Sequence, residues 1–377
     1  MVNGGSVRCR EQSNMNKVRF GVVGVGPWGE LHAHALARCP AAELAAVCDL
    51  NEGRARLVVA ATGARMYYTN YESLFADGSI DAVCIATPDH LHLEIASAAV
   101  RAGKHLLVEK PLATTVEEAE VIADLARQAK VKLMVNFHHR WHPALWGAWE
   151  SIRNNRIGEP HLLALRWNHR IDLPTRAILW TAQSSVGWYA GSHAVDAARW
   201  LTRDEVIRVY AASGMGVLDS LQVHTPDFFT AILEFSRGAV ATIETCWTLP
   251  HSAPSQSDIR GQIIGTEGVL YFDESHHRML ERYERVNVTQ STAYPDVAEA
   301  PSVQGQPVGY ALESVRAFAL AVARDEPPPV TAADGVAAAR IVAAIHQSAR
   351  TKQPVVLETP SLESQRPWDD DGITLRT

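Results

Sequence analysis

The sequence lacks an apolar run long enough to cross a lipid bilayer, because the Ala- and Val-rich stretches 41–48 and 331–346 are interrupted by Glu43, Asp334 and Arg340. It also lacks a basic cluster, since 35 Lys and Arg stand against 42 Asp and Glu and the net charge is -7. Proteins that bind nucleic acids usually carry a basic face. We therefore expect neither a membrane nor a nucleic acid as a partner.

Cysteine is scarce and gives no framework for a metal or redox site. The five cysteines are odd in number and scattered, without C-x-x-C spacing, at Cys9, Cys39, Cys48, Cys84 and Cys246. They are expected to be reduced and mostly buried. Residues 1–16 lack the apolar core of a secretion signal and are predicted to form a mobile tail, which favours a cytoplasmic location.

The length and composition predict a globular protein of two domains. A chain of 377 residues exceeds what one hydrophobic core usually serves, and 47% hydrophobic with 20% charged residues is ordinary for a folded protein. No whole-unit repeat or low-complexity tract is evident.

The first part of the chain alternates short apolar runs with helical patterns, which is typical of βαβ units around a parallel sheet. This predicts an α/β domain over 17–138. The predicted strands are 18–23, 43–48, 64–67, 82–86, 105–109 and 132–136, and the predicted helices are 28–38, 52–61, 71–76, 92–102 and 116–129.

The pattern changes near 137–141 to longer alternating strands, which predict an α+β domain over 139–358 with a large, mostly antiparallel sheet. A polar tail, 359–377, follows. The predicted strands are 161–170, 206–212, 228–236, 239–248, 258–264 and 269–272, and the helices are 141–153, 310–323 and 331–349, of which the last could pack on the first domain.

A glycine-rich turn follows the first strand, where Gly24, Gly26 and Gly29 form G-x-G-x-x-G with Pro27 and Trp28 at the start of a helix. Such glycines permit a tight turn and close approach to a pyrophosphate, which the free N–H groups of the helix N-terminus then bind. Pro27 suits the first helical turn. The alternative is that these glycines serve packing alone.

An acidic residue at the end of the second strand strengthens this interpretation. Asp49 lies about 20 residues after the last glycine, where a carboxylate accepts hydrogen bonds from the adenosine ribose hydroxyls. Its charge would repel a 2′-phosphate, so the sequence predicts a Rossmann domain that binds NAD in preference to NADP. Arg54 nearby keeps NADP open as the less favoured cofactor.

Two further motifs carry a resemblance to a known family. Thr87-Pro88-Asp89-His90-Leu91-His92 follows the fourth strand, and Glu109-Lys110-Pro111 follows the fifth. With the glycine turn, they resemble the Gfo/Idh/MocA family, which includes glucose-fructose oxidoreductase and inositol dehydrogenases, over residues 17–355. The resemblance implies sugar or cyclitol oxidation with NAD(P) and a homodimer or homotetramer formed through the C-terminal sheet. It implies cofactor contacts at Thr87, Pro88, His92, Glu109, Lys110 and Asn136.

Lys110 also has an interpretation from physical principles. It follows a strand at the carboxyl edge of the sheet, and Pro111 disfavours a helical conformation for it, so its ammonium should reach the ligand crevice. There it could hydrogen-bond a substrate hydroxyl and stabilise the developing carbonyl oxygen, as the family lysine does. A surface lysine at a strand end is the alternative.

In the second domain, the segment from Gly191 to Asp196 resembles the family's G-x-H-x-x-D motif. His193 and Asp196 are three residues apart and would share one helix face. We expect His193 to take the proton of the substrate hydroxyl, although it could instead be a structural histidine. Many inositol dehydrogenase-like members have an aspartate four residues before this histidine, and here Tyr189 stands there, which leaves the substrate open.

Other polar residues are predicted to line the substrate site or were considered for a metal. Arg140, with Asn136, resembles a family stretch that lines the cleft, and His169 is a cleft candidate on strand 161–170. The histidines His138, His139 and His142 could suggest a metal, but they have no carboxylate at a ligating interval, and neighbours on an extended segment point to opposite sides. No metal site is predicted.

Three functions stay open at this point. The first is an NAD-dependent dehydrogenase that converts a secondary hydroxyl of a sugar, sugar derivative or cyclitol to a ketone. The second is an enzyme that retains NAD and uses transient oxidation for glycoside cleavage or elimination. The third, a catalytically silent NAD-binding sensor, fits poorly with the presence of both Lys110 and His193.

Overall fold

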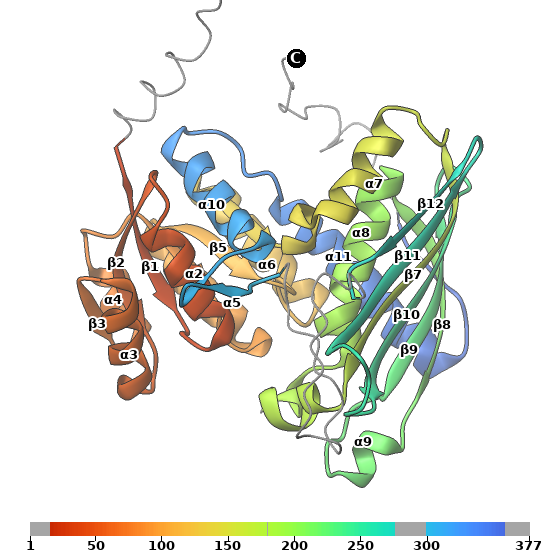
Figure 1. The fold of residues 1–377 in the computed structure, drawn as a ribbon, viewed down its shortest axis with the longest axis horizontal. Coiled ribbons are helices and arrows are strands. Elements are labelled where there is room, and N and C mark those ends of the chain that lie inside the picture. The colour runs from red at the N-terminus through yellow and green to blue at the C-terminus, as the bar shows by residue number, and fades with distance from the viewer. Residues whose placement is uncertain (1–15, 179, 276–298, 359–377) are drawn as a thin grey trace, which may run out of the picture. The chain divides into compact units, whose positions relative to one another are not determined.

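The computed structural model describes residues 16–178, 180–275 and 299–358 (Figure 1). Except for residue 16, the tails predicted at 1–16 and 359–377 lie outside these residues. The described chain divides into two compact units. Unit 1 holds 16–143 and 299–339, and unit 2 holds 144–275 and 340–358. The boundary falls within one helix, α11 (Ala332–Thr351).

A parallel six-stranded sheet forms the centre of unit 1, in the order β3-β2-β1-β4-β5-β6. Every neighbouring pair in it is parallel, which confirms the predicted α/β class. The order reverses between β1 and β4, and open α/β sheets bind ligands at such a point, outside the carboxyl ends of the strands. The strands are β1 (Val18–Val23), β2 (Ala42–Cys48), β3 (Met66–Tyr68), β4 (Ala82–Ile85), β5 (His105–Glu109) and β6 (Leu133–Asn136).

The helices between these strands begin at residues that can cap them. The side chains of Asn51, Asn70 and Thr115 accept hydrogen bonds from amides of the first turns of α3, α4 and α6, and so replace missing helical partners. The helices are α2 (Pro27–Ala37), α3 (Glu52–Thr62), α4 (Tyr71–Ala76), α5 (His92–Arg101) and α6 (Val116–Ala129), and the 3-10 turn η2 (Asp89–Leu91) precedes α5.

A segment from late in the sequence completes the core of unit 1. The short hairpin of β13 (Ser302–Val303) and β14 (Gln306–Pro307) leads into α10 (Tyr310–Ala323), which packs against α2. Phe318 of α10 meets Phe20 of β1 edge to face, with ring centroids 6.0 Å apart. Residues about 300 positions apart therefore share one apolar core.

Unit 2 is built on a seven-stranded sheet in the order β12-β11-β7-β10-β9-β8-β15. Only β7 and β10 pair in parallel, so the sheet is mostly antiparallel, as predicted. Buried and exposed residues alternate along β9 and β10, so one face of the sheet is covered. The strands are β7 (Pro160–Arg170), β8 (Val206–Gly214), β9 (Phe228–Phe235), β10 (Val240–Leu249), β11 (Ser257–Gly265), β12 (Val269–Asp273) and β15 (Val355–Val356).

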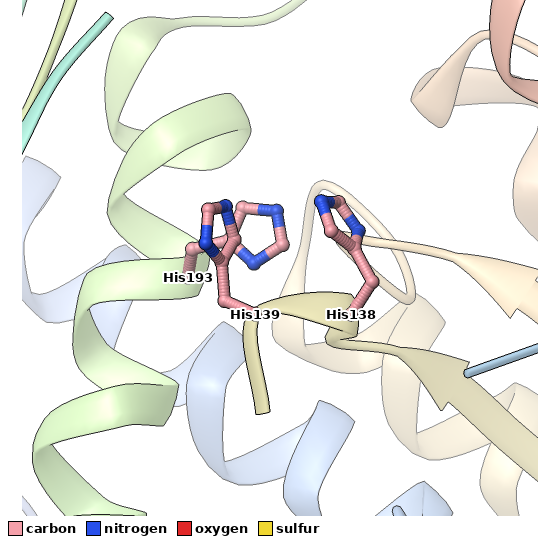
Figure 2. Close-up of side chains that lie close together, drawn as sticks. All are labelled: His138, His139 and His193. Carbon is pink, nitrogen blue, oxygen red and sulfur yellow. The ribbon is translucent and has the colours of Figure 1, made fainter. Parts of the chain in front are cut away.

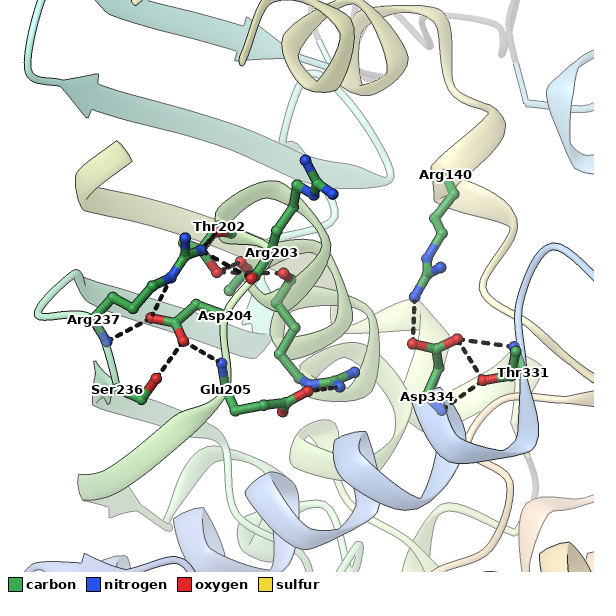
Figure 3. Close-up of polar contacts among 11 residues, drawn as sticks. Arg140, Thr202, Arg203, Asp204, Glu205, Ser236, Arg237, Thr331 and Asp334 are labelled. Carbon is green, nitrogen blue, oxygen red and sulfur yellow. Dashed lines mark hydrogen bonds and ion pairs between the residues drawn. The ribbon is translucent and has the colours of Figure 1, made fainter. Parts of the chain in front are cut away.

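Helix α8 (Ser192–Thr202) covers the inner face of this sheet, and every residue of it is buried. Trp200 of α8 stacks on Trp149 of α7 (Pro143–Arg153), with centroids 5.5 Å apart and an interplanar angle of 8°. After α8, Asp204 accepts hydrogen bonds from Ser236 and Arg237 and joins the helix end to the sheet (Figure 3). The remaining elements of unit 2 are the turns η4 (Leu173–Ala177), η5 (Thr181–Gln183) and η6 (Gly187–Gly191) and the short helix α9 (Val217–Ser220).

No helix among the described residues is long and apolar enough to span a membrane. The four cysteines in the described chain are free thiols, three of them buried, in agreement with the prediction, and Cys9 lies outside the described residues.

Candidate active site

The glycine turn between β1 and α2 has the backbone that the motif predicts. Gly24 has a φ of +80°, and a Cβ there would lie 2.7 Å from the carbonyl oxygen of Ala86. A Cβ on Gly29 would lie 1.7 Å from the carbonyl oxygen of Gly24, so the helix and turn can approach only because this residue is glycine. At Gly26 a Cβ would meet nothing within 4 Å, which leaves the backbone open to a ligand.

Helix α2 begins directly after this turn. Pro27 occupies the first helical turn, where its missing N–H costs no helical hydrogen bond. No side chain caps the first turn, so its amides are available for an anion. Trp28 points its ring toward His138, with centroids 4.6 Å apart.

Asp49 lies at the end of β2 as predicted, beside the glycine turn. Its carboxylate accepts hydrogen bonds from the amides of Val25, at 3.0 Å, and Asn51, at 2.8 Å. The guanidinium of Arg54 is 3.5 Å from the same carboxylate, and the Arg54 side chain is about half exposed. Asp49 therefore stabilises the turn itself, and its oxygens keep lone pairs for ribose hydroxyls.

The segment after β4 is held by a buried histidine. The Nδ1 atom of His92 is 2.8 Å from the carbonyl oxygen of Pro111, and its Nε2 atom is 3.1 Å from that of Thr87. Both ring nitrogens thus face backbone carbonyls, so His92 positions two loops rather than offering a nitrogen to a cofactor. Next to Pro88, the buried Thr87 hydroxyl has no hydrogen-bond partner in the described chain.

Glu109 and Lys110 are both buried where β5 ends. The Glu109 carboxylate accepts a hydrogen bond from Asn136 at 2.7 Å and lies 2.9 Å from Nε2 of His32, on α2. Glu109 therefore contacts this helix and strand β6, and these contacts fix the backbone that precedes Lys110. The Oδ1 atom of Asn136 is buried without a hydrogen-bond partner among the described residues.

The two neighbouring charges have strongly perturbed ionisation. Burial by itself raises the pKa of Glu109, but the hydrogen bond and charge of His32 outweigh it and lower that pKa to about 2. Burial lowers the pKa of Lys110, although nearby carboxylates, Glu109 first, oppose the shift. Lysines with a lowered pKa are more frequent at catalytic sites than elsewhere, so this shift marks Lys110 as a candidate site residue.

The segment after β6 differs from the prediction. Residues 138–141 form a 3-10 turn (η3), not an extended segment, so His138 and His139 do not point to opposite sides. Their rings stack instead, with centroids 4.8 Å apart (Figure 2). A 3-10 turn advances about 120° per residue, whereas an extended strand alternates by 180°. His142 meets Tyr310 of α10 edge to face at 4.7 Å.

Arg140 is engaged within unit 1. Its guanidinium is 3.2 Å from the carboxylate of Asp334, and both side chains are buried (Figure 3). Asp334 also accepts hydrogen bonds from the amide and hydroxyl of Thr331, while Thr331 accepts one from the Asp334 amide. This is a reciprocal capping box at the start of α11, and Arg140 joins it to η3.

In unit 2, His193 is the second residue of α8, within the first helical turn as predicted (Figure 2). Both His193 and Asp196 are buried. The π-helical turn η6 immediately precedes α8 and carries Tyr189, four residues before His193. A local change from π to α geometry is common at functional sites in helices.

Tyr189 lies among aromatic side chains from the inner face of the sheet. Its ring is 6.0 Å from that of His169 on β7 and 5.8 Å from that of Trp247 on β10. Trp247 and Thr245 are two residues apart and share this face, and the indole N–H and the hydroxyl are buried without partners in the described chain. Such groups usually have a hydrogen-bond partner, so they are available to a polar ligand.

Three residues of these clusters were missed by the sequence interpretation, namely His32, Thr245 and Trp247. His32 lies three residues after the last glycine of the turn, one helical turn further along α2, and this spacing could have indicated it. Trp247 carries no motif, and only the strand alternation with Thr245 could have placed it on the inner face.

The residues of unit 1 fit a dinucleotide. The open backbone at Gly26 and the uncapped start of α2 suit a diphosphate, and Asp49 suits a ribose. The unpartnered Thr87 hydroxyl and Asn136 Oδ1, at the ends of β4 and β6, suit a polar group such as a carboxamide.

Comparison with known proteins agrees with this geometry. Residues 18–137 match the model GFO_IDH_MocA, described as an oxidoreductase family with an NAD-binding Rossmann fold, and residues 150–357 match that family's C-terminal alpha/beta domain.

The chain is similar to named dehydrogenases along most of its length. It is 26% identical to myo-inositol 2-dehydrogenase of Thermotoga maritima over 90% of this chain and 99% of the relative. It is 30% identical to scyllo-inositol 2-dehydrogenase (NAD(+)) of Bacillus subtilis over 70% of this chain and 76% of the relative. The crystal structure of scyllo-inositol dehydrogenase from Lactobacillus casei with NAD(H) and scyllo-inositol superposes with a TM-score of 0.74 at 19% identity, covering 90% of this chain and 99% of that one, which supports the fold.

Proposed function

Because the chain belongs to the Gfo/Idh/MocA family of oxidoreductases with an NAD-binding Rossmann domain, we propose that it oxidises a secondary hydroxyl of a sugar, sugar derivative or cyclitol to a ketone. The observation that carries the proposal is the buried Lys110 directly after β5, two strands along the sheet from β1 and its glycine turn, with Glu109 fixed by His32 and Asn136 beside it.

NAD, when bound, supplies the acceptor for the hydride that leaves the substrate carbon. Gly24, Gly26 and the start of α2 would hold its diphosphate, and Asp49 its ribose. Thr87 and Asn136 would hydrogen-bond the nicotinamide end.

Lys110 and His193 have different roles at the substrate hydroxyl. The Lys110 ammonium donates a hydrogen bond to the hydroxyl oxygen and stabilises it as it becomes a carbonyl oxygen. His193 accepts the hydroxyl proton, so the substrate loses one proton and one hydride and becomes a ketone. Asp196, on the same helix, favours the protonated imidazole that results.

One wall of the substrate site would orient the ring of the sugar or cyclitol. It consists of the side chains of Tyr189, His169, Trp247 and Thr245. Their aromatic faces suit the C–H face of a sugar or cyclitol, and the unpartnered Trp247 N–H and Thr245 hydroxyl suit its hydroxyl groups. Because Tyr189 cannot supply a negative charge, this wall offers the substrate aromatic faces and hydrogen bonds rather than a charged partner.

The proposal includes a cytoplasmic enzyme that forms a homodimer or homotetramer through the outer face of the unit 2 sheet. On the neighbouring strands β8 and β9 this face exposes the large apolar side chains of Tyr210, Phe228 and Ile232, and Tyr271 is exposed on β12 at the other edge of the sheet. Adjacent exposed apolar side chains of this kind often mark an interface.

The test is a panel of sugars, sugar acids and inositols with NAD⁺ and NADP⁺, with the absorbance of the reduced nicotinamide as the readout. Turnover of at least one neutral polyol with NAD⁺ is expected. Turnover of none of them, together with NAD that copurifies and stays bound, would contradict the proposal and favour an enzyme that uses transient oxidation for cleavage or elimination.

A further inference from the structure

A buried serine and a histidine from distant parts of unit 2 hold the turn before His193. The Oγ atom of Ser185 is 2.7 Å from Nε2 of His346, which lies on α11. Ser185 belongs to the segment Ser184 to Trp188, which leads directly into η6 and from there into α8.

The hydrogen bonds of His346 define its tautomer. Its Nδ1 is 2.8 Å from the carbonyl oxygen of Val342, which has no proton, so Nδ1 carries the N–H and donates it. In the neutral ring Nε2 is then an acceptor, and the Ser185 hydroxyl donates to it. Burial, together with the charge of Arg350, lowers the pKa of His346 although the Val342 contact opposes the shift, which favours this neutral ring.

Ser185 in turn fixes the start of η6. Its Oγ accepts a hydrogen bond from the amide of Trp188 at 3.2 Å, and its carbonyl oxygen accepts one from the amide of Tyr189 at 2.9 Å. The residue that caps η6, Val186, contributes no side-chain hydrogen bond. The Ser185 hydroxyl is therefore the side-chain cap of the turn that carries Tyr189 and leads into His193.

The packing around His346 leaves little freedom for other arrangements. Its ring stacks on Trp188, with centroids 5.4 Å apart at 21°, and lies 4.5 Å from the ring of Phe229. A Cβ on Gly187 would come within 2.6 Å of the imidazole carbon Cε1, so the turn fits around the ring because this residue is glycine.

We propose that His346 is a positioning residue of the substrate site, which acts through Ser185 to fix the turn that places Tyr189 and His193. The inference rests on the proposed function, because it assigns these two residues to the substrate. It adds a residue more than 150 positions away in sequence that does not touch the substrate itself.

The test uses variants that separate the hydrogen bond from the packing. His346→Phe keeps an aromatic ring but has no acceptor, Ser185→Ala removes the donor, and His346→Gln restores an acceptor. Gln347→Ala, at an exposed neighbour on α11, is the matched control. We expect roughly tenfold lower kcat for the first two, as for the loss of one buried hydrogen bond, with partial recovery in His346→Gln and an unchanged Kd for NAD. The double variant should be little worse than either single one.

A second readout does not depend on turnover. Hydrogen exchange of the amides 187–193, followed by mass spectrometry, should be faster in His346→Phe and Ser185→Ala and close to wild type in His346→Gln and Gln347→Ala. Unchanged exchange in His346→Phe and Ser185→Ala would overturn the inference. So would a wild-type kcat in either of these variants when its exchange has increased. A wild-type chain without turnover on the whole panel would instead refute the proposed function, from which this inference would fall as well.

Discussion

At the residue scale, burial has opposite consequences for the pKa values of the adjacent Glu109 and Lys110. Burial raises the pKa of Glu109, but the hydrogen bond and charge of His32, with the charges of His138 and Lys110, lower it to about 2. Burial lowers the pKa of Lys110, and Glu109 is the first of the carboxylates that oppose this shift.

The Glu109 contacts predict a pH-dependent stability. Its pKa in the fold, about 2, lies below its usual 4.5, so the contribution is complete above pH 4.5 and is lost as the pH falls toward 2. It amounts to about 3 kcal/mol. Urea unfolding of wild type and Glu109→Gln between pH 7 and pH 3 should show a difference in unfolding free energy that narrows below pH 4.5. A difference that stays constant over this range would contradict the assignment.

Lys110 and His193 should be needed for turnover and not for binding NAD. Lys110→Ala and His193→Ala are each expected to lower kcat by about 10² to 10⁴, because each removes a group that acts on the reacting hydroxyl. Steady-state kinetics with calorimetric NAD titration measures both effects. Lys17→Ala and His161→Ala, at exposed positions, serve as controls. Near-normal kcat in either test variant would remove that residue from the mechanism.

Asp49 should determine the preference for NAD. Asp49→Asn keeps one of the two oxygens that accept from the Val25 and Asn51 amides, and it removes the charge that repels a 2′-phosphate. We expect weaker NAD binding and a smaller ratio between the Kd values for NADP and NAD, both measured by calorimetry. An unchanged ratio would show that the carboxylate does not select the cofactor.

At the element scale, the parallel sheet and its helices could be predicted because each apolar run and cap residue is local. The predicted strands of unit 1 begin and end within two residues of β1 to β6. The 3-10 turn at 138–141 could not be predicted in this way, since His138 and His139 take their conformation from contacts with Trp28 and Tyr310, on elements far away in sequence. The π-helical turn η6 likewise packs against a distant residue, His346 of α11, whose ring stacks on Trp188.

The capping box of α11 predicts that Asp334 contributes strongly to the stability of the fold. Asp334→Asn removes the charge of the buried carboxylate that pairs with the Arg140 guanidinium and should lower the free energy of unfolding by about 3 kcal/mol. Asp325→Asn breaks an ion pair with Lys132 whose aspartate is fully exposed to solvent, so it should lower the free energy of unfolding much less. Urea unfolding of both variants measures the two losses of unfolding free energy. Equal losses would mean that the Arg140 contact is no stronger than a surface pair.

At the scale of the whole molecule, sequence motifs located most of the proposed site but not its surroundings. The glycine turn, Asp49, Lys110 and His193 could be found because each belongs to a spaced motif. Ser185, Trp247 and His346 could not, because their roles come from side-chain contacts between segments that the fold brings together. His32 belongs to no motif, and only its helical spacing from the glycine turn could have indicated it.

The exposed apolar side chains on the outer face of the unit 2 sheet predict that copies of the chain assemble through this face. Ile232→Arg places a charge between the exposed Tyr210 and the strand β10, and should dissociate a homodimer or homotetramer in sedimentation velocity experiments. Leu57→Arg, at an exposed apolar residue of α3, should leave the assembly unchanged. A wild-type chain that sediments as a monomer would contradict this part of the proposal.

The most direct test of the dehydrogenase itself follows one atom. A neutral polyol that the enzyme turns over is deuterated at the carbon that bears the reacting hydroxyl, and the nicotinamide is analysed by mass spectrometry after one turnover. Transfer of the deuterium to the reduced nicotinamide, with a matching amount of ketone, is the predicted result. Product without deuterium on a released reduced cofactor, or deuterium in the product alone, would contradict the account.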